Sequence, residues 1–151
     1  MTTPWHRVEA FVAHLSRCAV QKGETVVLLA ETDSRPELVE AAALALGSLG
    51  IDAPKLVLPT QPNLGPVPIR STGASMAIAG HPAAVAGLTT ADFVLDCTVE
   101  GLLHAPELAD ILAAGTRVLM VSNEHPEVFD RIGHDPTLAD RVALGAERLE
   151  E

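Results

Sequence analysis

TVVLLAETDSRPELVEAAALALGSLG, residues 25–50, is the stretch of the chain that decides the fold. Residues 25–30 form a continuous apolar run rich in Val and Leu, which is typical of a strand buried on both faces. Ser34 and Glu37 then have the three-residue spacing of a capping box, and we expect a helix after them that stops at Gly50. The stretch therefore predicts a strand, a turn and a helix in succession.

The rest of the chain repeats this alternation. Apolar residues recur at three- and four-residue steps over residues 4–21, which predicts an amphipathic helix ended by Gly23. Further strands are expected at 55–59, 92–97 and 117–121, and further helices at 81–88, 106–114, 126–132 and 138–151. Such alternation implies parallel strands joined by right-handed crossovers. The sequence thus predicts a single α/β domain over residues 1–151, a three-layer Rossmann-like fold with a mainly parallel sheet of about four strands.

Residues 60–80 interrupt the pattern. Three prolines and three glycines lie within this segment, at Pro62, Pro66, Pro68, Gly65, Gly73 and Gly80. The segment is too long and too irregular for an ordinary connection, so we interpret it as a Pro/Gly-rich arm or lid.

Composition excludes several classes of partner. The net charge is −10, from 20 acidic residues against 10 Lys and Arg, so the chain repels phosphate backbones and anionic lipid surfaces. No stretch has the roughly 18 uncharged apolar residues of a membrane-spanning helix. Cys18 and Cys97 lack CxxC spacing, which indicates reduced core thiols in a cytoplasmic protein. We therefore expect neither nucleic acid nor membrane as a partner.

Polar residues follow three of the expected strands. In open parallel sheets, ligands bind beyond the carboxyl ends of the strands, and here those ends are residues 31–34, 98–104 and 122–126. None of them contains the glycine pattern of a dinucleotide or Walker phosphate site, and the chain has no GxSxG elbow. These loops are the candidate site, but not for a dinucleotide or a serine nucleophile.

His104 is the candidate of most interest in these loops. It follows two leucines and precedes an expected helix, so its imidazole could face a ligand while Leu102 or Leu103 packs against a flat apolar ring. The alternative is that His104 fills the turn before Pro106, and the residues alone leave both open. His125, with Glu124 beside it, is interpreted first as the entrance of a helix.

A metal site within the chain is not expected. His81, His104 and His125 are far apart in sequence, and no HxH, HxD or HExxH pair is present. A zinc or iron site would have to assemble entirely from distant loops, so we predict no metal ligands on this chain.

Three segments together resemble a known family. Residues 23–27 leading to Glu31 and Thr32, residues 91–96 leading to 100–104, and residues 115–120 leading to 124–127 are similar to the N-terminal domain of the 2,5-dihydroxypyridine 5,6-dioxygenase family. That family is related in fold to the aminopeptidase T type of metallopeptidases. The Leu102-Leu103-His104 and Glu124-His125-Pro126-Glu127 segments are the most distinctive parts of the resemblance.

The resemblance implies a function for the loops. It implies a ring-opening dioxygenase that holds Fe(II) with two histidines and one carboxylate from its C-terminal domain, and no such segment lies within residues 1–151. The N-terminal domain would contribute the substrate-facing loop, which falls on Leu103 and His104. His104 would orient or deprotonate the ring hydroxyl, and Thr32, Glu124 and His125 would complete the substrate side. We expect the chain to be inactive alone and to need a C-terminal metal-binding domain or a partner chain.

Two other functions stay open at this stage. One is the N-terminal domain of an aminopeptidase T-like metallopeptidase, and the other is a non-catalytic module that binds a small molecule or a partner. The final helix, which has no C-cap, and the arm at 60–80 lack internal partners in this interpretation, which makes a homo-oligomer plausible.

Overall fold

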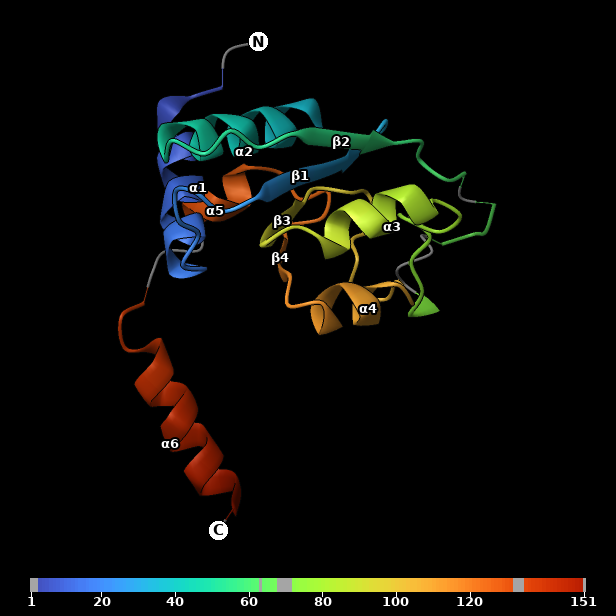
Figure 1. The fold of residues 1–151 in the computed structure, drawn as a ribbon. Coiled ribbons are helices and arrows are strands. Elements are labelled where there is room, and N and C mark those ends of the chain that lie inside the picture. Colours follow the sequence, from blue (N-terminus) through green and yellow to red (C-terminus); the bar gives the residue numbers. More distant parts are fainter. Residues whose placement is uncertain (1–2, 63, 68–71, 132–134, 151) are drawn as a thin grey trace.

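A four-stranded parallel sheet forms the centre of the molecule. The structure, a computed structural model, describes residues 3–62, 64–67, 72–131 and 135–150 (Figure 1). The strands are β1 (Val26–Glu31), β2 (Lys55–Leu58), β3 (Phe93–Asp96) and β4 (Arg117–Met120), in the order β2-β1-β3-β4. The helices are α1 (Trp5–Arg17), α2 (Pro36–Ser48), α3 (Pro82–Thr89), α4 (Leu108–Ala113), α5 (Glu127–Arg131) and α6 (Leu138–Glu150). The predicted fold class is confirmed.

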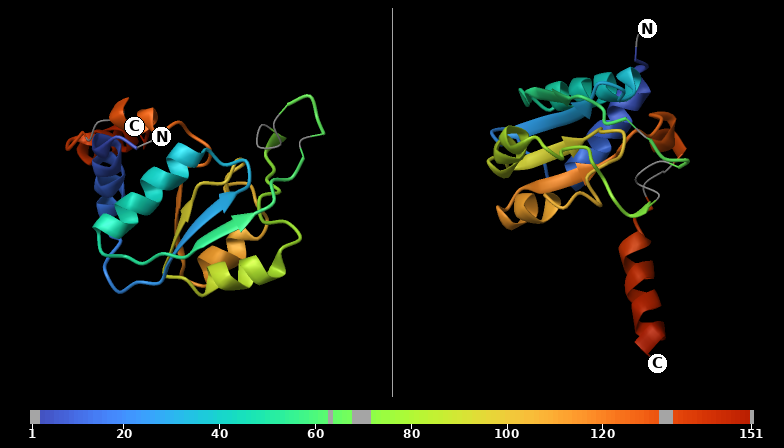
Figure 2. Two further views of the ribbon diagram at one scale, coloured as in Figure 1. Left: turned by 90° about the horizontal axis from the view of Figure 1, so that it is seen from above. Right: turned by 90° about the vertical axis from the view of Figure 1, so that its right-hand side faces the viewer.

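Helices cover both faces of the sheet, and this explains the apolar runs. In β1, Val26, Leu28 and Ala30 pack in one core with α1 and α2, whereas Leu29 belongs to a second core with α3 and α4. Alternate residues of a strand point to opposite faces, so a central strand between two helical layers must be apolar at almost every position. Figure 2 shows this three-layer arrangement from two further directions.

Every expected helix and strand is present, with ends that differ by a few residues. The largest difference is at α1, which ends at Arg17 and not at residue 21. Cys18 closes the helix, and Ala19 adopts a positive φ of 54°, so the chain turns before it reaches Gly23. Helix ends depend on such local turns, which apolar periodicity does not report.

The predicted capping box is wrong. Helix α2 starts at Pro36, and its N-cap residue Arg35 makes no side-chain capping hydrogen bond. The Ser34 hydroxyl instead donates to the carbonyl of Cys97 at 2.8 Å and accepts from the amide of Glu31 at 2.8 Å. Ser34 therefore joins the carboxyl end of β1 to that of β3, because it is buried between the two strands and not exposed at a helix start.

The segment between β2 and α3 is irregular, as expected. Its described residues contain no α-helix or β-strand, and Leu64 is 92% exposed. Ser75 and Ile78 are buried, so the part nearest α3 is anchored in the core. Pro68, one of the prolines that suggested an arm, lies outside the described residues, and a lid function stays a prediction.

Helix α6 extends away from the layered body (Figures 1 and 2). Each of its side chains that the structure describes is exposed. Four of them are large apolar residues, Leu138, Val142, Leu144 and Leu149. The amphipathic helix expected at the end of the chain therefore forms without covering its own apolar residues.

The role of Ser34 can be tested by two substitutions. Ser34→Ala should lower the free energy of unfolding by about 1–3 kcal/mol, because it removes a buried hydroxyl that serves two backbone groups. Glu37→Ala should cost less than about 1 kcal/mol, since it removes only a favourable charge in the first turn of α2. Urea unfolding measures both. Equal losses of unfolding free energy in the two variants would show that Ser34 and Glu37 act together as a capping box.

Candidate functional site

The strand order determines where the loops of the sheet diverge. From β1 the chain continues into α2 on one face of the sheet, and from the neighbouring β3 it continues to α4 on the other face. The carboxyl ends of β1 and β3 are therefore the switch point of the sheet, the place where open α/β domains bind their ligands. The predicted loops 31–34 and 98–104 begin there.

Two buried carboxylates mark this switch point. Glu31 is 3% exposed and Asp96 is fully buried. Asp96 lies beside Leu29 in the strand register, so Glu31 lies two residues further along the neighbouring strand. A two-residue step keeps the side-chain direction, and both carboxylates therefore point to the face that α3 and α4 cover.

Asp96 organises the loop that follows its own strand. Its Oδ1 accepts hydrogen bonds from the amide of Thr98 at 2.9 Å and the hydroxyl of Thr98 at 2.6 Å, and its Oδ2 accepts from the amide of Leu102 at 2.9 Å. Burial raises the pKa of Asp96, and the three hydrogen bonds oppose that effect. The side chain is fully engaged within the protein, so its role is structural.

Glu31 reaches the same loop from the neighbouring strand. Its Oε2 accepts from the amide of Val99 at 2.6 Å. Burial raises the pKa of Glu31, the amides of Val99 and Glu100 lower it, and the nearby charges of Asp96 and Glu100 raise it further. The Glu31 carboxylate thus joins the end of β1 to the loop after β3.

Two more contacts hold this loop. The Ser75 hydroxyl donates to the carbonyl of Gly101 at 2.5 Å. Gly101 has a φ of 71°, and a Cβ at this position would lie 2.4 Å from the Oγ of Ser122, in the loop after β4. Glycine is favoured here because both the positive φ and the close approach of Ser122 disfavour a side chain.

Leu103 and His104 form the exposed tip of the loop. The amide of Ala105 donates to the carbonyl of Leu102 at 2.9 Å, which closes a turn with Leu103 and His104 at its centre. Leu102 is fully buried and Ala105 nearly so, whereas Leu103 is 65% exposed and His104 is also exposed. Of the two leucines considered for ligand contact, Leu103 is accessible and Leu102 is part of the core. A substrate role for Leu103 and His104 stays a prediction.

The other predicted site residues make contacts within the protein. The amide of Thr60 donates to the Thr32 hydroxyl at 3.0 Å, so Thr32 ties the end of β1 to the end of β2. His125 Nδ1 accepts from the amide of Glu127 at 3.2 Å, at the entrance of α5 as expected. Glu124 is exposed in the turn before it. A substrate role for these three residues stays a prediction.

Arg35 and Asn123 join two of the loops, and neither was predicted as a site residue. The amide of Arg35 donates to Asn123 Oδ1 at 2.8 Å and its Nε donates to the Asn123 carbonyl at 2.9 Å, which links the loops after β1 and β4. No local pattern marks such a pair. For Glu31 and Asp96 a signal was present, because each places a carboxylate at the end of a run that is otherwise apolar.

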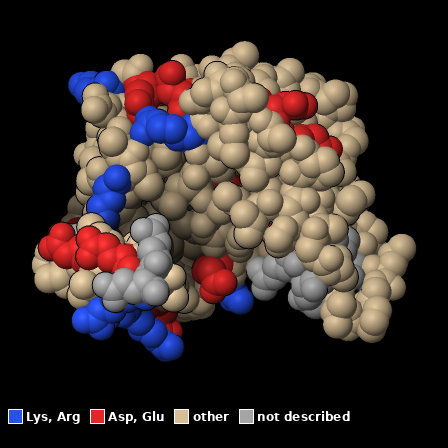
Figure 3. All heavy atoms as spheres, turned by 90° about the horizontal axis from the view of Figure 1, so that it is seen from below, with Lys and Arg blue, Asp and Glu red and all other residues tan. Residues whose placement is uncertain are grey.

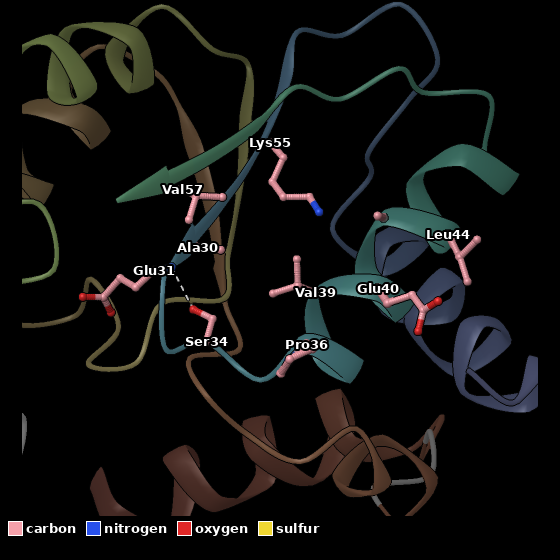
Figure 4. A pocket seen from close by; sticks show the side chains of 10 residues that line it. Ala30, Glu31, Ser34, Pro36, Val39, Glu40, Leu44, Lys55 and Val57 are labelled. Atoms are coloured by element: carbon pink, nitrogen blue, oxygen red, sulfur yellow. Dashed lines mark hydrogen bonds between the residues drawn. The ribbon is translucent and has the colours of Figure 1, made fainter. Parts of the chain in front are cut away.

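Two cavities in the described part of the chain are lined by residues other than Leu103 and His104. One of about 430 Å³ lies between α2 and the edge strand β2, where Val39, Lys55 and Ser34 surround it (Figure 4). The Glu31 side chain also borders this cavity, but its carboxylate points to the other side of β1. The second, of about 510 Å³, is lined by residues of α3 and α4 together with His81.

The described residues contain neither a cluster of metal ligands nor, at Cys97, a reactive thiol. Within residues 3–62, 64–67, 72–131 and 135–150, no three His, Cys, Asp or Glu side chains gather where they could hold a metal ion. They therefore do not fit the Fe(II) site that the resemblance implies. Burial raises the pKa of the Cys97 thiol, which keeps it protonated and unreactive.

Charged side chains occupy a small part of the face drawn in Figure 3. On the face drawn in Figure 3, acidic and basic side chains form separate small groups and most of the surface is uncharged.

In the part of the chain that the structure describes, no helix is both long and apolar enough to cross a lipid bilayer.

Comparison with known proteins identifies the family. The family model described as 2,5-dihydroxypyridine 5,6-dioxygenase matches residues 6–151. The chain belongs to this dioxygenase family. A curated relative, the 2,5-dihydroxypyridine 5,6-dioxygenase of Pseudomonas putida, is 36% identical over 141 residues. The resemblance stated from the sequence is therefore confirmed.

A solved structure supports the same assignment. The 2,5-dihydroxypyridine dioxygenase of Pseudomonas putida KT2440 superposes with a TM-score of 0.72 at 31% identity, over 83% of this chain. The match to the curated dioxygenase covers 91% of this chain but only 38% of the relative, and the match to the solved structure covers 36% of that chain. The chain thus spans less than two fifths of these dioxygenases.

The raised pKa of Glu31 predicts how stability depends on pH. The folded chain binds the carboxyl proton of Glu31 more tightly than the unfolded chain does. The contribution of Glu31 to stability therefore falls as the pH rises above 4.5, the ordinary pKa of a glutamate side chain. Glu31→Gln removes the titration and keeps an acceptor for the Val99 amide. The stability of Glu31→Gln relative to the natural chain should therefore increase from pH 4 to pH 7. Thermal unfolding across this range measures it, and a constant difference would contradict the assigned pKa direction.

Gly101 and Gly87 form a matched pair for a second prediction. Gly101→Ala should cost about 1–2 kcal/mol, because alanine resists the positive φ of 71° and would contact Ser122. Gly87→Ala in α3 meets no atom within 4 Å and should stabilise the chain by about 0.5–1 kcal/mol. Chemical denaturation gives both values. A gain of stability from both variants would show that the loop does not need glycine at residue 101.

Proposed function

We propose that this chain is the substrate-side domain of an Fe(II)-dependent ring-cleaving dioxygenase that acts on a hydroxylated pyridine such as 2,5-dihydroxypyridine. Membership of the dioxygenase family supports the reaction class. The observation that carries the role of the chain is the exposed tip of Leu103 and His104, held at the carboxyl edge of the sheet by a buried hydrogen-bonded loop.

The two residues of the tip suit a flat ring that carries a hydroxyl. Leu103 offers an exposed apolar side chain to the face of the ring, and burying that surface would favour binding. The His104 imidazole can accept the hydroxyl proton or donate a hydrogen bond to the oxygen, because its two ring nitrogens can serve as acceptor and donor. His104 would thereby orient the ring and remove its proton before oxygen is inserted.

The iron would be held outside the described residues of this chain. In the proposed enzyme, a C-terminal metal-binding domain or a partner chain supplies two histidines and a carboxylate, and iron bound there supplies the oxygen chemistry. The exposed apolar residues of α6 support contact with such a domain or with another copy of the chain. We expect the chain by itself to be inactive and the complete enzyme to work in the cytoplasm.

A second function is a binding module without catalysis, and the cavity between α2 and β2 favours it. This cavity of about 430 Å³ has the size of a small-molecule site.

An N-terminal domain of an aminopeptidase T-like metallopeptidase is the alternative among enzymes. Coding sequence that continues past Glu151 into a segment with paired histidines and a carboxylate would support the dioxygenase, and a stop codon there would support the module.

His104→Ala tests the proposed role directly. In the longest reading frame that encodes this chain, the substitution should lower turnover of 2,5-dihydroxypyridine by about tenfold or more without a loss of stability, because it removes the acid–base group at an exposed position. Oxygen consumption and the loss of pyridine absorbance measure turnover. His81→Ala, at the start of α3, is the matched control and should retain full activity. An unchanged rate in His104→Ala would remove the proposed role of His104.

A further inference from the structure

We propose that Glu31 is a positioning residue that fixes the Leu103–His104 tip through the amide of Val99. The inference rests on the proposed function, because it assumes that this tip meets the substrate. Glu31 belongs to β1, whereas the tip follows β3, and Glu31 acts on the tip through Val99. The contact that carries it is the 2.6 Å hydrogen bond from the Val99 amide to Glu31 Oε2.

The loop from Thr98 to Ala105 is held at successive backbone groups. Asp96 accepts from the amides of Thr98 and Leu102, and the carbonyl of Leu102 accepts from the amide of Ala105. These bonds define the local shape of the loop, but Asp96 belongs to the strand from which the loop departs. They leave the placement of the loop relative to β1 to other contacts.

Glu31 supplies that placement. It is the last residue of β1, and its carboxylate crosses the switch point of the sheet to hold the loop after β3. Val99 lies between the two amides that Asp96 holds and precedes Leu103 and His104 in the loop. Glu31 therefore ties the middle of the loop to β1, in addition to the bonds that Ser34 and Ser75 make at its two ends.

The chemical identity of Glu31 is hard to explain by stability alone. Its side chain is 3% exposed and lies near the charge of Asp96, and both burial and this neighbour disfavour a carboxylate. An apolar residue, such as Leu29 two positions earlier on the same face, would satisfy the core without that cost. It would leave the Val99 amide without its acceptor. A costly buried carboxylate that accepts from the backbone of one loop is the pattern expected where the geometry of a site is being held.

Two variants of Glu31 separate the hydrogen bond from the charge. Glu31→Gln keeps an acceptor for Val99 and loses the charge, whereas Glu31→Met has a similar length and has no comparable acceptor. Asp92→Ala is the matched control, because Asp92 Oδ2 accepts from the amide of Thr25 at 2.7 Å in the same way at the opposite end of β3.

The first measurement is amide hydrogen exchange with backbone chemical shifts in the 151-residue chain. Glu31→Met should speed exchange at Val99 by about tenfold, the equivalent of one lost hydrogen bond to a charged group, and should shift the amide signals of Leu103 and His104. Glu31→Gln should restore both toward the natural values, and Asp92→Ala should leave both unchanged. Unaltered exchange at Val99 and unaltered signals at His104 in Glu31→Met would overturn the inference.

A Glu31→Met chain that does not fold would still leave a decisive measurement. In the natural chain, the amide proton of Val99 should change its chemical shift with pH in step with the carboxyl carbon of Glu31, because the two groups share a hydrogen bond. Independent titration of the two signals would overturn the proposed contact.

Kinetics in the longest reading frame then connect the contact to catalysis. Glu31→Met should lower kcat/KM for 2,5-dihydroxypyridine by about tenfold, Glu31→Gln should recover most of it, and Asp92→Ala should keep the natural value despite its own loss of stability. Natural kinetics in Glu31→Met, alongside a loss of activity in His104→Ala, would overturn the positioning role and leave the proposed function standing. An unchanged rate in His104→Ala would instead remove the proposed role of His104, on which this inference rests.

Discussion

Both central strands of the sheet are covered by helices on both faces, and this burial constrains everything at their carboxyl ends. Glu31, Ser34 and Asp96 are buried at these ends, so their polar side chains must find partners within the protein. The partners are mostly backbone amides and carbonyls of neighbouring strands and loops. Ser34 bridges β1 and β3, and Glu31 and Asp96 hold three amides of one loop.

This arrangement accounts for the contrast between the two halves of the loop after β3. Its first half is buried or half-buried and hydrogen-bonded, and at Gly101 a Cβ would lie 2.4 Å from the Oγ of Ser122. Its second half projects Leu103 and His104 outward from a closed turn. A rigid base beneath an exposed tip is what a substrate-facing loop requires, because catalysis depends on the placement of a group as much as on its chemistry.

The dioxygenase family gives this tip a chemical context. The chain covers less than two fifths of the Pseudomonas dioxygenases to which it is similar, and its described residues gather no metal-binding cluster. We propose a division of labour in which the sheet edge of this chain orients the ring and a separate domain or chain holds the iron. The exposed apolar side chains on α6 are consistent with an interaction of that kind.

The sequence by itself determined the α/β class, the parallel sheet and the three strand-end loops. These follow from short-range properties, because continuous apolar runs and three- to four-residue periodicity depend only on which faces of an element are buried. It also placed Leu103 and His104 in a loop, and it carried enough family-specific residues to indicate the dioxygenase family. Only the tertiary structure decided that Ser34 bridges two strands and does not cap α2, that Leu102 is buried while Leu103 is exposed, and that Glu31 meets Val99. Each of these depends on a pairing between segments that are distant in sequence, because strand register and loop packing choose the partner and no local pattern records that choice.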